Sequence, residues 1–286
     1  MLGVAILGFV ISFIYWFLFI PRGIYNVNRN LNNDFSEDQK ELKPTYEFLE
    51  IDYERTSGVI SLFCLNILLV IFISTYTYEQ FFETIKTANQ LSADTHDGVN
   101  AVIMSIIMAI MVILFYFKSG FNFDKKARQL KLLAKIWIFL NAVLISSTMM
   151  KNTAQVLSLG YTYKTLGVYA FLILSVLGLL FTFLKIQKQK TNAYLFNQMF
   201  YCFFATILVC SYVNWGAFIT SQNIKRADFA ENFHLKGIDF NEKQMLEYAE
   251  KTNNAAMKNE IVSRVLSRQA DSFLSKSLYF ETVKIK

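Results

Sequence analysis

The two histidines of this 286-residue chain are the first side chains to consider for chemistry. His96 lies close to Asp94 and Asp97, and the second imidazole, His234, lies in the C-terminal part of the chain. A metal site needs three or four converging ligands, and one imidazole with two carboxylates supplies them without a specific spacing. We therefore expect His96 to be an ordinary loop or helix-cap residue, and we predict no metal site.

Motifs for nucleophilic catalysis and nucleotide binding are the next candidates. A nucleophilic enzyme needs a Ser or Cys beside a base, as in a Gly-x-Ser-x-Gly turn, and a phosphate-binding loop needs clustered glycines. Neither pattern occurs in the sequence, whose eleven glycines are scattered. We predict no catalytic residue and no cofactor, and an enzyme that uses His96 is the last-ranked hypothesis.

Four amide side chains fall within apolar segments: Asn66, Asn141, Asn197 and Gln198. An unpaired amide facing lipid is costly, so we expect these side chains to point inward and to form hydrogen bonds between helices. The alternative is that they line a cavity for a substrate. Lys135 is the one charged residue within a predicted span, which disfavours coupled ion transport, and its long stem is expected to reach the inner headgroups.

The composition indicates which elements must position these residues. Hydrophobic residues make up 54% of the chain, the mean hydropathy is +0.33, and charged residues make up 17%, against roughly 25% in soluble domains. Only two prolines occur, which favours long helices. We predict an all-α, polytopic membrane protein. The net charge of +6 comes from clusters of Lys and Arg beside the apolar segments, so we expect the lipid bilayer as a partner and no nucleic acid.

Six segments are long enough to cross a bilayer, which takes roughly 20 mostly apolar residues. They lie at about 2–20, 58–76, 99–117, 132–150, 165–184 and 194–215. Together they define a six-helix transmembrane bundle over residues 1–215, with a polar loop over 21–57. Residues 216–286 form an extramembrane tail.

Basic residues in the loops predict the orientation. The loops 21–57, 118–131 and 185–193 hold five, five and three Lys or Arg residues, whereas the alternate loops hold only Lys86, Lys151 and Lys164. Basic loops stay in the cytoplasm. We therefore predict that the loop 21–57 is cytoplasmic, and that both termini and the tail are extracytoplasmic.

The tail reads as amphipathic helices. Asn241, with Gln244 three residues later, is typical of an N-terminal cap, and Gly237 is expected to end the preceding helix. A further helix is predicted from about Ala255 to Leu278. Seventy residues seldom make a self-sufficient core, so the tail is expected to pack on itself, on the membrane surface or on a partner.

A resemblance extends over roughly residues 95–226. It is carried by the stretches His96-Asp97-Gly98-Val99, Leu140-Asn141-Ala142-Val143-Leu144, Gly160-Tyr161-Thr162-Tyr163-Lys164, Val213-Asn214 and Gln222-Asn223-Ile224-Lys225-Arg226. These stretches resemble an uncharacterised bacterial family of multi-span inner-membrane proteins, classed as a domain of unknown function. The resemblance implies a bacterial inner (cytoplasmic) membrane and supplies no activity.

The matched residues gather at the predicted outer face of the membrane. They form a polar cluster of His96, Thr162, Tyr163, Lys164, Asn214, Asn223 and Arg226. One hypothesis is a binding site for a lipid headgroup, a peptide or the tail itself. The other is that these side chains tie the tail helices to the bundle, because such residues also satisfy helix ends.

Two functional hypotheses follow from these observations. The first is a non-enzymatic membrane subunit or scaffold of a bacterial envelope complex, which engages another membrane or envelope protein through its helical tail. The alternative is a transporter or lipid-handling protein with an amide-lined cavity between its helices.

Overall fold

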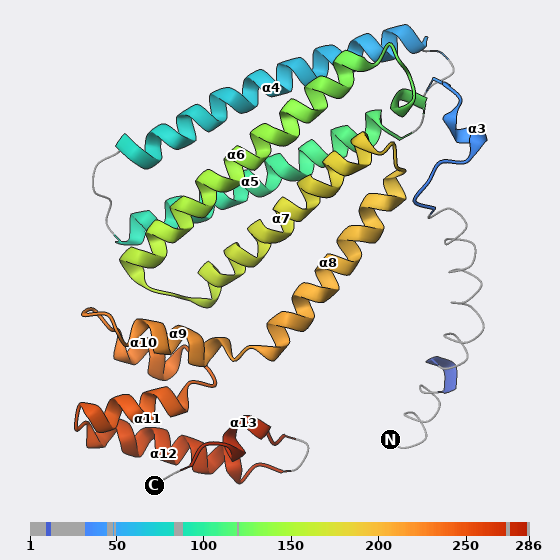
Figure 1. The fold of residues 1–286 in the computed structure, drawn as a ribbon. Coiled ribbons are helices and arrows are strands. Elements are labelled where there is room, and N and C mark those ends of the chain that lie inside the picture. The colour runs from blue at the N-terminus through green and yellow to red at the C-terminus, as the bar shows by residue number, and fades with distance from the viewer. Residues whose placement is uncertain are drawn as a thin grey trace. The chain divides into compact units, whose positions relative to one another are not determined.

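The chain folds into helices joined by short connections (Figure 1). The structure, a computed structural model, describes residues 10–12, 32–44, 48, 50–82, 88–118, 120–272 and 275–284, without the side chains of 38, 80–82 and 88–97. Every regular element labelled within these ranges is helical, which confirms the all-α prediction.

Five of the helices are long and apolar enough to cross a membrane, so the chain is a multi-pass membrane protein. They are α4 (Ile51–Phe82), α5 (Ala88–Tyr116), α6 (Arg128–Leu159), α7 (Tyr163–Gln187) and α8 (Asn192–Tyr212). Each contains most or all of one predicted span. The first predicted span, 2–20, lies outside the described residues except for residues 10–12. The last, 194–215, runs past the end of α8, because the chain turns at Val213 and Asn214 before the next helix.

The described chain divides into two compact units. The first comprises residues 1–83, 100–147 and 173–204, and it contains α4 with parts of α5 to α8. Its core is apolar and includes Leu62, Val102 and Leu130, each with no exposed surface. Gly58 allows close packing here, because a Cβ atom at this position would lie 2.8 Å from the Tyr116 ring. Two short elements, α3 (Glu37–Lys40) and a 3-10 turn (Gly120–Asn122), also belong to this unit.

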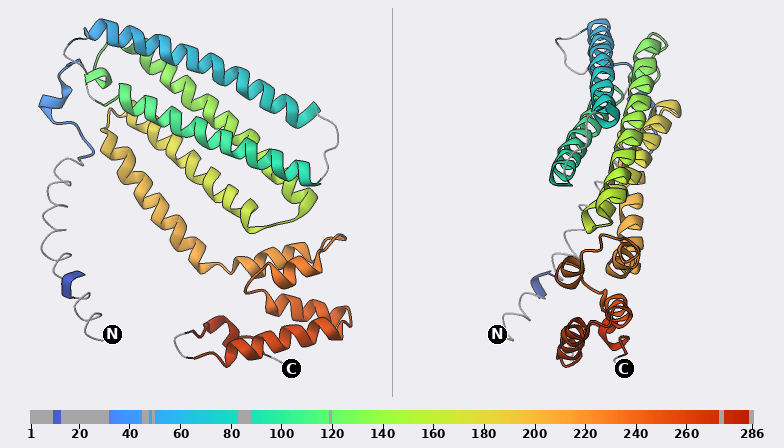
Figure 2. Two further views of the ribbon diagram at one scale, coloured as in Figure 1. Left: turned by 180° about the vertical axis from the view of Figure 1, so that it is seen from behind. Right: turned by 90° about the vertical axis from the view of Figure 1, so that its left-hand side faces the viewer.

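The second unit comprises residues 84–99, 148–172 and 205–286. Its tail contains α9 (Trp215–Asn223), α10 (Glu231–Lys236), α11 (Glu242–Lys251), α12 (Ala255–Gln269) and α13 (Leu278–Glu281). Helices α11 and α12 lie side by side (Figure 1 and Figure 2). The tail has a hydrophobic core of its own, made of Leu235, Met245, Ala249, Met257, Ile261, Val265, Phe280 and Val283.

The predicted helix 255–278 is wrong in its length. Helix α12 ends at Gln269, and residues 270–272 leave the helix, so that the short α13 follows as a separate element. The amide of Gln269 then donates to the carbonyls of Phe280 and Val283, at 2.8 and 3.3 Å. This return covers the apolar face of α12 with Phe280 and Val283, which a continuous helix would carry away from the core.

The predicted boundary between α10 and α11 is correct, but the expected cap is not formed. Helix α10 ends at Lys236 before Gly237, and α11 begins at Glu242 after Asn241. The side chain of Asn241 makes no capping bond to the helix. It is fully buried and donates instead to Thr220 and to the carbonyl of His234. Tertiary hydrogen bonds of the NH₂ group therefore orient this side chain, and the amide oxygen, which a cap would use, makes no hydrogen bond to the described residues.

Candidate functional site

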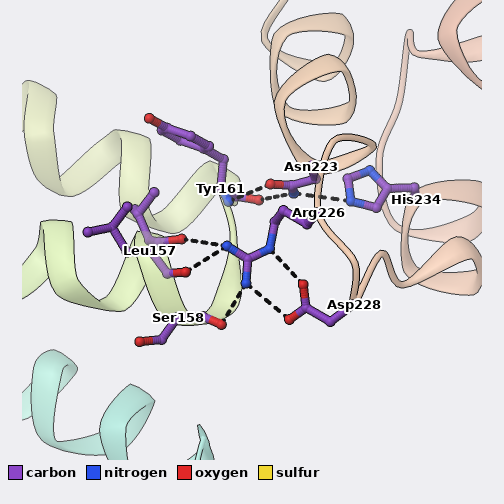
Figure 3. A network of polar contacts seen from close by, with 8 residues as sticks. Leu157, Ser158, Tyr161, Asn223, Arg226, Asp228 and His234 are labelled. Carbon is purple, nitrogen blue, oxygen red and sulfur yellow. Dashed lines mark hydrogen bonds and ion pairs between the residues drawn. The ribbon is translucent and has the colours of Figure 1, made fainter.

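Arg226, which follows α9, closes the C-terminal end of α6 (Figure 3). Its guanidinium donates to the carbonyls of Leu157 and Ser158, each at 2.7 Å, and to that of Val156 at 3.4 Å. The last carbonyls of a helix have no partner within the helix, and the negative end of the helix dipole favours a cation. The planar fork of arginine presents five N–H donors in fixed directions, so it can bond several carbonyls and a carboxylate together.

Asp228 completes the setting of this guanidinium. Its two carboxylate oxygens accept from Nε and Nη2 of Arg226, at 2.9 and 3.0 Å. The hydrogen bond from Arg226 holds the pKa of the Asp228 carboxyl below its ordinary value. The arginine therefore lies between a carboxylate and a helix end, and both contacts fix its direction.

Asn223, the last residue of α9, forms two hydrogen bonds with the backbone of Tyr161 (Figure 3). Its amide oxygen accepts from the Tyr161 N–H and its amide nitrogen donates to the Tyr161 carbonyl, both at 2.8 Å. Gly160 makes this approach possible. Its φ of +86° is strained for other residues, and a Cβ atom there would lie 2.7 Å from the Asn223 amide oxygen.

The arrangement of donors defines the protonation state of His234. The backbone of Tyr161 fixes which end of the Asn223 amide is the NH₂ group, and that group lies 3.1 Å from His234 Nε2. Because the NH₂ group only donates, Nε2 must accept. The proton of the neutral ring is then on Nδ1, which donates to Thr220 Oγ1 at 3.0 Å.

Burial keeps this imidazole neutral. His234 is 2% exposed, and its ring packs against those of Phe229 and Phe233, with centroids 4.7 and 5.3 Å away. Burial lowers the pKa of His234 to about 4. A second proton on the ring would also point an N–H group at the NH₂ group of Asn223, which is repulsive.

Further contacts connect the start of α7 and of α9 with the segment before α11. Tyr163 donates its hydroxyl to the Asp239 carbonyl at 3.3 Å, and Asn214 donates to the Phe240 carbonyl at 2.9 Å. The oxygen of Asn214 also caps α9 by accepting from Ala217 N–H at 2.9 Å. We use the name tail junction for the set of Tyr161, Thr220, Asn223, Arg226, Asp228, His234 and Asn241.

The predicted outer-face cluster is only partly brought together. Asn223 and Arg226 belong to the tail junction, and Tyr163 and Asn214 make the neighbouring contacts. Thr162 instead pairs with Thr165 at the start of α7, where each side chain accepts from the other residue's N–H. Lys164 is exposed, and the side chain of His96 lies outside the described residues.

Sequence reasoning missed Thr220, Asp228, His234 and Asn241 at this site. Thr220, His234 and Asn241 are buried polar residues on or beside tail helices, and none is more than 2% exposed. The one available signal was a lone polar residue on an otherwise apolar helix face. That signal does not say which distant group a residue pairs with.

The chemistry of the tail junction is structural. Its donors and acceptors are directed at backbone carbonyls, at a backbone N–H and at one another, and its imidazole is enclosed by aromatic rings. Among the described side chains, no group of three His, Cys, Asp or Glu residues could hold a metal ion. The geometry therefore suits the fixing of two chain segments to each other.

The predicted intramembrane amides occupy different settings in the first unit. Asn66 donates to Leu133 O on α6 at 3.1 Å, and Asn141 donates within its own helix while accepting from Ser105 on α5 at 3.4 Å. Asn197 donates to Asn33, which precedes α3, and Gln198 is half-buried on α8. The four amides thus do not meet in one place.

A second polar network closes the C-terminal end of α5, and sequence reasoning missed it. Lys185 is fully buried and donates to the carbonyl of Phe117 at 2.7 Å. Asn122 donates to the same carbonyl at 2.8 Å, and Asn192 donates to that of Leu114 at 3.0 Å. Helix α7 extends to Gln187, three residues past the predicted span, and therefore includes Lys185, a residue of the predicted loop 185–193.

The comparisons with known proteins give a family. No curated protein and no solved structure matches this chain. A family model described as domain of unknown function (DUF4153) matches residues 1–248, which include α4 to α10, the first part of α11 and the whole tail junction. This match confirms the expected resemblance to an uncharacterised family and extends it beyond residues 95–226. The chain belongs to the DUF4153 family, a domain of unknown function.

Proposed function

We propose that the chain is a non-enzymatic integral membrane subunit or scaffold of a bacterial envelope complex, and that it engages a partner protein through its C-terminal tail. The tail junction is the observation that carries this proposal. It joins α9 and α10 to the α6–α7 connection through the hydrogen bonds of Asn223 and Arg226, while α11 to α13 pack around a core of their own. A tail held in this way is a rigid platform.

The tail also has a groove that suits a protein segment. Helices α11 and α12 and residues 282–284 line a groove of about 320 Å³. Leu246, Val262 and Val283 supply apolar surface, and the remaining lining includes Lys243, Glu247, Glu250, Lys258 and Lys284. Interfaces commonly combine an apolar centre with a polar rim. A helical or extended segment with both charge signs is the partner chemistry that fits.

We also propose that the protein lies in the bacterial inner membrane with both termini extracytoplasmic. The excess of basic residues in the loops 21–57, 118–131 and 185–193 supports this orientation. The tail then meets its partner outside the cytoplasm. A cysteine in place of Ser272 should react with an impermeant reagent added to intact cells, and one in place of Lys125 should react only after lysis. Cells in which the two cysteines show the opposite pattern would reverse the orientation.

The alternative function is a transporter or lipid-handling protein with an amide-lined cavity. The contacts of the amides favour the subunit proposal. Asn66 donates to a carbonyl of its own helix and to Leu133 O of α6, and Asn141 donates to a carbonyl of its own helix, so these NH₂ groups are bonded to helix backbone. The third hypothesis, an enzyme that uses His96, has no support from the described residues.

The test is co-purification from the native membrane in mild detergent. Glu247→Lys with Glu250→Lys reverses two charges in the groove on exposed positions of α11. Glu260→Lys is the matched control, because this residue is equally exposed but lies outside the groove. We expect a stoichiometric partner with the wild type and the control, and its loss with the double variant.

The outcomes of this experiment distinguish docking in the groove from the subunit proposal as a whole. Equal recovery of the partner with both variants would contradict docking in the groove. A wild-type protein that purifies without any stoichiometric protein would contradict the subunit proposal as a whole. All substituted positions are exposed, and the ion pair of Glu250 with Lys258 that the double variant loses lies at the surface, so the variants should unfold close to the wild-type temperature. That measurement separates a binding defect from a folding defect.

A further inference from the structure

An apolar groove runs between α6 and α7 in the first unit. It has a volume of about 300 Å³ and is lined by Ile138, Phe139, Ala142, Val176, Leu179, Leu180 and Phe183, with Lys135 at one end. Ile138 and Leu179 are buried, whereas Phe139 is 67% exposed and Val176 and Leu180 are about half exposed. The groove therefore has a buried floor between protruding apolar walls, on two helices that cross the membrane.

The surroundings of Lys135 place a cation at the end of this groove. The ammonium donates to Gln187 Oε1 at 2.6 Å and lies 5.5 Å from the centre of the Phe183 ring. Both contacts direct the ammonium towards α7, beside the groove. An ammonium has three donors, and Gln187 accepts from one of them among the described residues. Lys135 is only half-buried, so the other donors remain accessible to a ligand.

The length and polarity of the groove match one lipid chain. Residues 135 to 142 on α6 span about 10 Å along the helix axis, which suits the upper part of an acyl chain. The lining beyond Lys135 is wholly apolar, so a polar ligand has no partner there. Lys135 offers a positive charge where a phosphate would lie when the chain occupies the groove.

We propose that the α6–α7 groove binds one anionic phospholipid, with an acyl chain between Phe139 and Leu180 and the phosphate on Lys135. The lipid fills a depression that side chains leave open, and the lysine selects for negative charge. Basic residues near a membrane surface attract anionic lipids. This site is independent of the partner proposed for the tail, because its residues all belong to the first unit.

The test is native mass spectrometry of the full chain with equal amounts of phosphatidylglycerol and phosphatidylcholine of the same chain length. Lys135→Met should reduce the preference for phosphatidylglycerol about fivefold, the effect of losing one lysine near the headgroup. Lys118→Met is the matched control, since Lys118 is an exposed lysine outside the groove. We expect the control to keep the wild-type preference.

A second pair of variants tests the acyl chain. Ala142→Phe fills the groove and should remove the bound lipid of either headgroup, whereas Val143→Phe adds the same ring at the next, exposed position and should not. Wild-type binding by Lys135→Met would overturn the headgroup assignment. Unchanged binding by Ala142→Phe would overturn the acyl-chain assignment. A wild-type protein without preference between the two lipids would overturn the proposal.

Discussion

The C-terminal ends of α5 and α6 are both closed by a basic side chain, but the two cations differ in origin and in setting. Lys185 comes from another membrane-spanning helix, is fully buried, and shares its carbonyl with an amide. Arg226 comes from the tail, is partly exposed, and has a carboxylate partner in Asp228. The Lys185 contact connects helices of the first unit, and the Arg226 contact connects the tail to the α6–α7 connection.

This difference indicates which of the two helix ends depends on its cation. At the end of α5, the Phe117 carbonyl keeps a donor in Asn122 when the lysine is lost. At the end of α6, the single guanidinium serves the carbonyls of Leu157 and Ser158. The tail junction also depends on an uncharged imidazole, which the α5 end does not. The tail junction should therefore be the more sensitive of the two to substitution and to pH.

The largest effect is expected for Gly216→Ala. A Cβ atom at this position would lie 1.8 Å from the carbonyl oxygen of Asp239, so the backbone of the tail must move. We expect a loss of stability of the tail on the order of 4 kcal/mol, typical of severe overpacking. Limited proteolysis should cleave the tail of the variant and spare the helices of the first unit.

The matched control is Gly167→Ala, where a Cβ atom meets nothing within 4 Å. Gly167 lies within α7, so alanine should be neutral or slightly stabilising there. Equal protease resistance of the tail in both variants would contradict the close approach of Gly216 to Asp239.

The next effect concerns acid. The pKa of His234 is about 4 in the folded tail because of burial, and near 6.5 in the unfolded chain. Between these values the unfolded state binds the proton and the folded state does not, so stability falls as the pH falls from about 6.5 to about 4. The expected loss is a few kcal/mol, measured by thermal unfolding of the tail.

His234→Gln supplies the control for this pH dependence. Glutamine keeps an acceptor for Asn223 and does not titrate, so the variant should lose less stability than the wild type over the same pH range. Other acidic groups contribute equally to both proteins, and the difference between them isolates the imidazole. Parallel pH profiles would mean that His234 is not held neutral by its surroundings.

The contacts at the two helix ends are compared directly with the variants Arg226→Gln and Lys185→Met. The arginine variant should cost about 1–2 kcal/mol, because charged hydrogen bonds to two carbonyls are lost at a partly exposed position. The lysine variant should cost less than about 1 kcal/mol, because an apolar side chain of similar volume often replaces a buried charge well. Hydrogen exchange of the two helix ends measures both effects, and a larger cost for Lys185→Met would reverse the ranking.

The smallest effect is expected for Asn141→Leu in the first unit. This amide donates to a carbonyl of its own helix and accepts a long bond from Ser105. Interhelical hydrogen bonds in membranes contribute about 1 kcal/mol or less, so the variant should remain folded and close to wild-type stability. Loss of a cellular function in a stable Asn141→Leu protein would instead favour the amide-lined cavity.

The sequence was sufficient for elements whose signal is local. Apolar runs located the helices, because lipid requires every span to satisfy its own backbone. The end of α10 before Gly237 and the start of α11 after Asn241 followed from residue types alone. Asn223 and Arg226 were singled out by a resemblance, and attachment of the tail to the bundle was one of the two hypotheses for them. Their individual partners Tyr161, Leu157 and Ser158 were not predicted.

The remaining features depend on partners far apart in the chain. Asn241 looks like a helix cap, but its side chain is oriented by a hydrogen bond from its NH₂ group to Thr220, 21 residues earlier. Lys185 ends an apolar run and reads as a loop residue until the carbonyl of Phe117, 68 residues away, is brought to it. Helix periodicity continues past Gln269, but burial of Phe280 on α12 requires the chain to turn back. Local patterns contain no information on such pairings.

The tie between Arg226 and α6 also sets an order of events during biosynthesis. Arg226 lies 69 residues after Leu157, and both α7 and α8 are made in between. The carbonyls at the end of α6 therefore lack the Arg226 guanidinium until two further helices have entered the membrane. A chain whose translation stops before residue 226 has all its described spanning helices and an open α6–α7 connection.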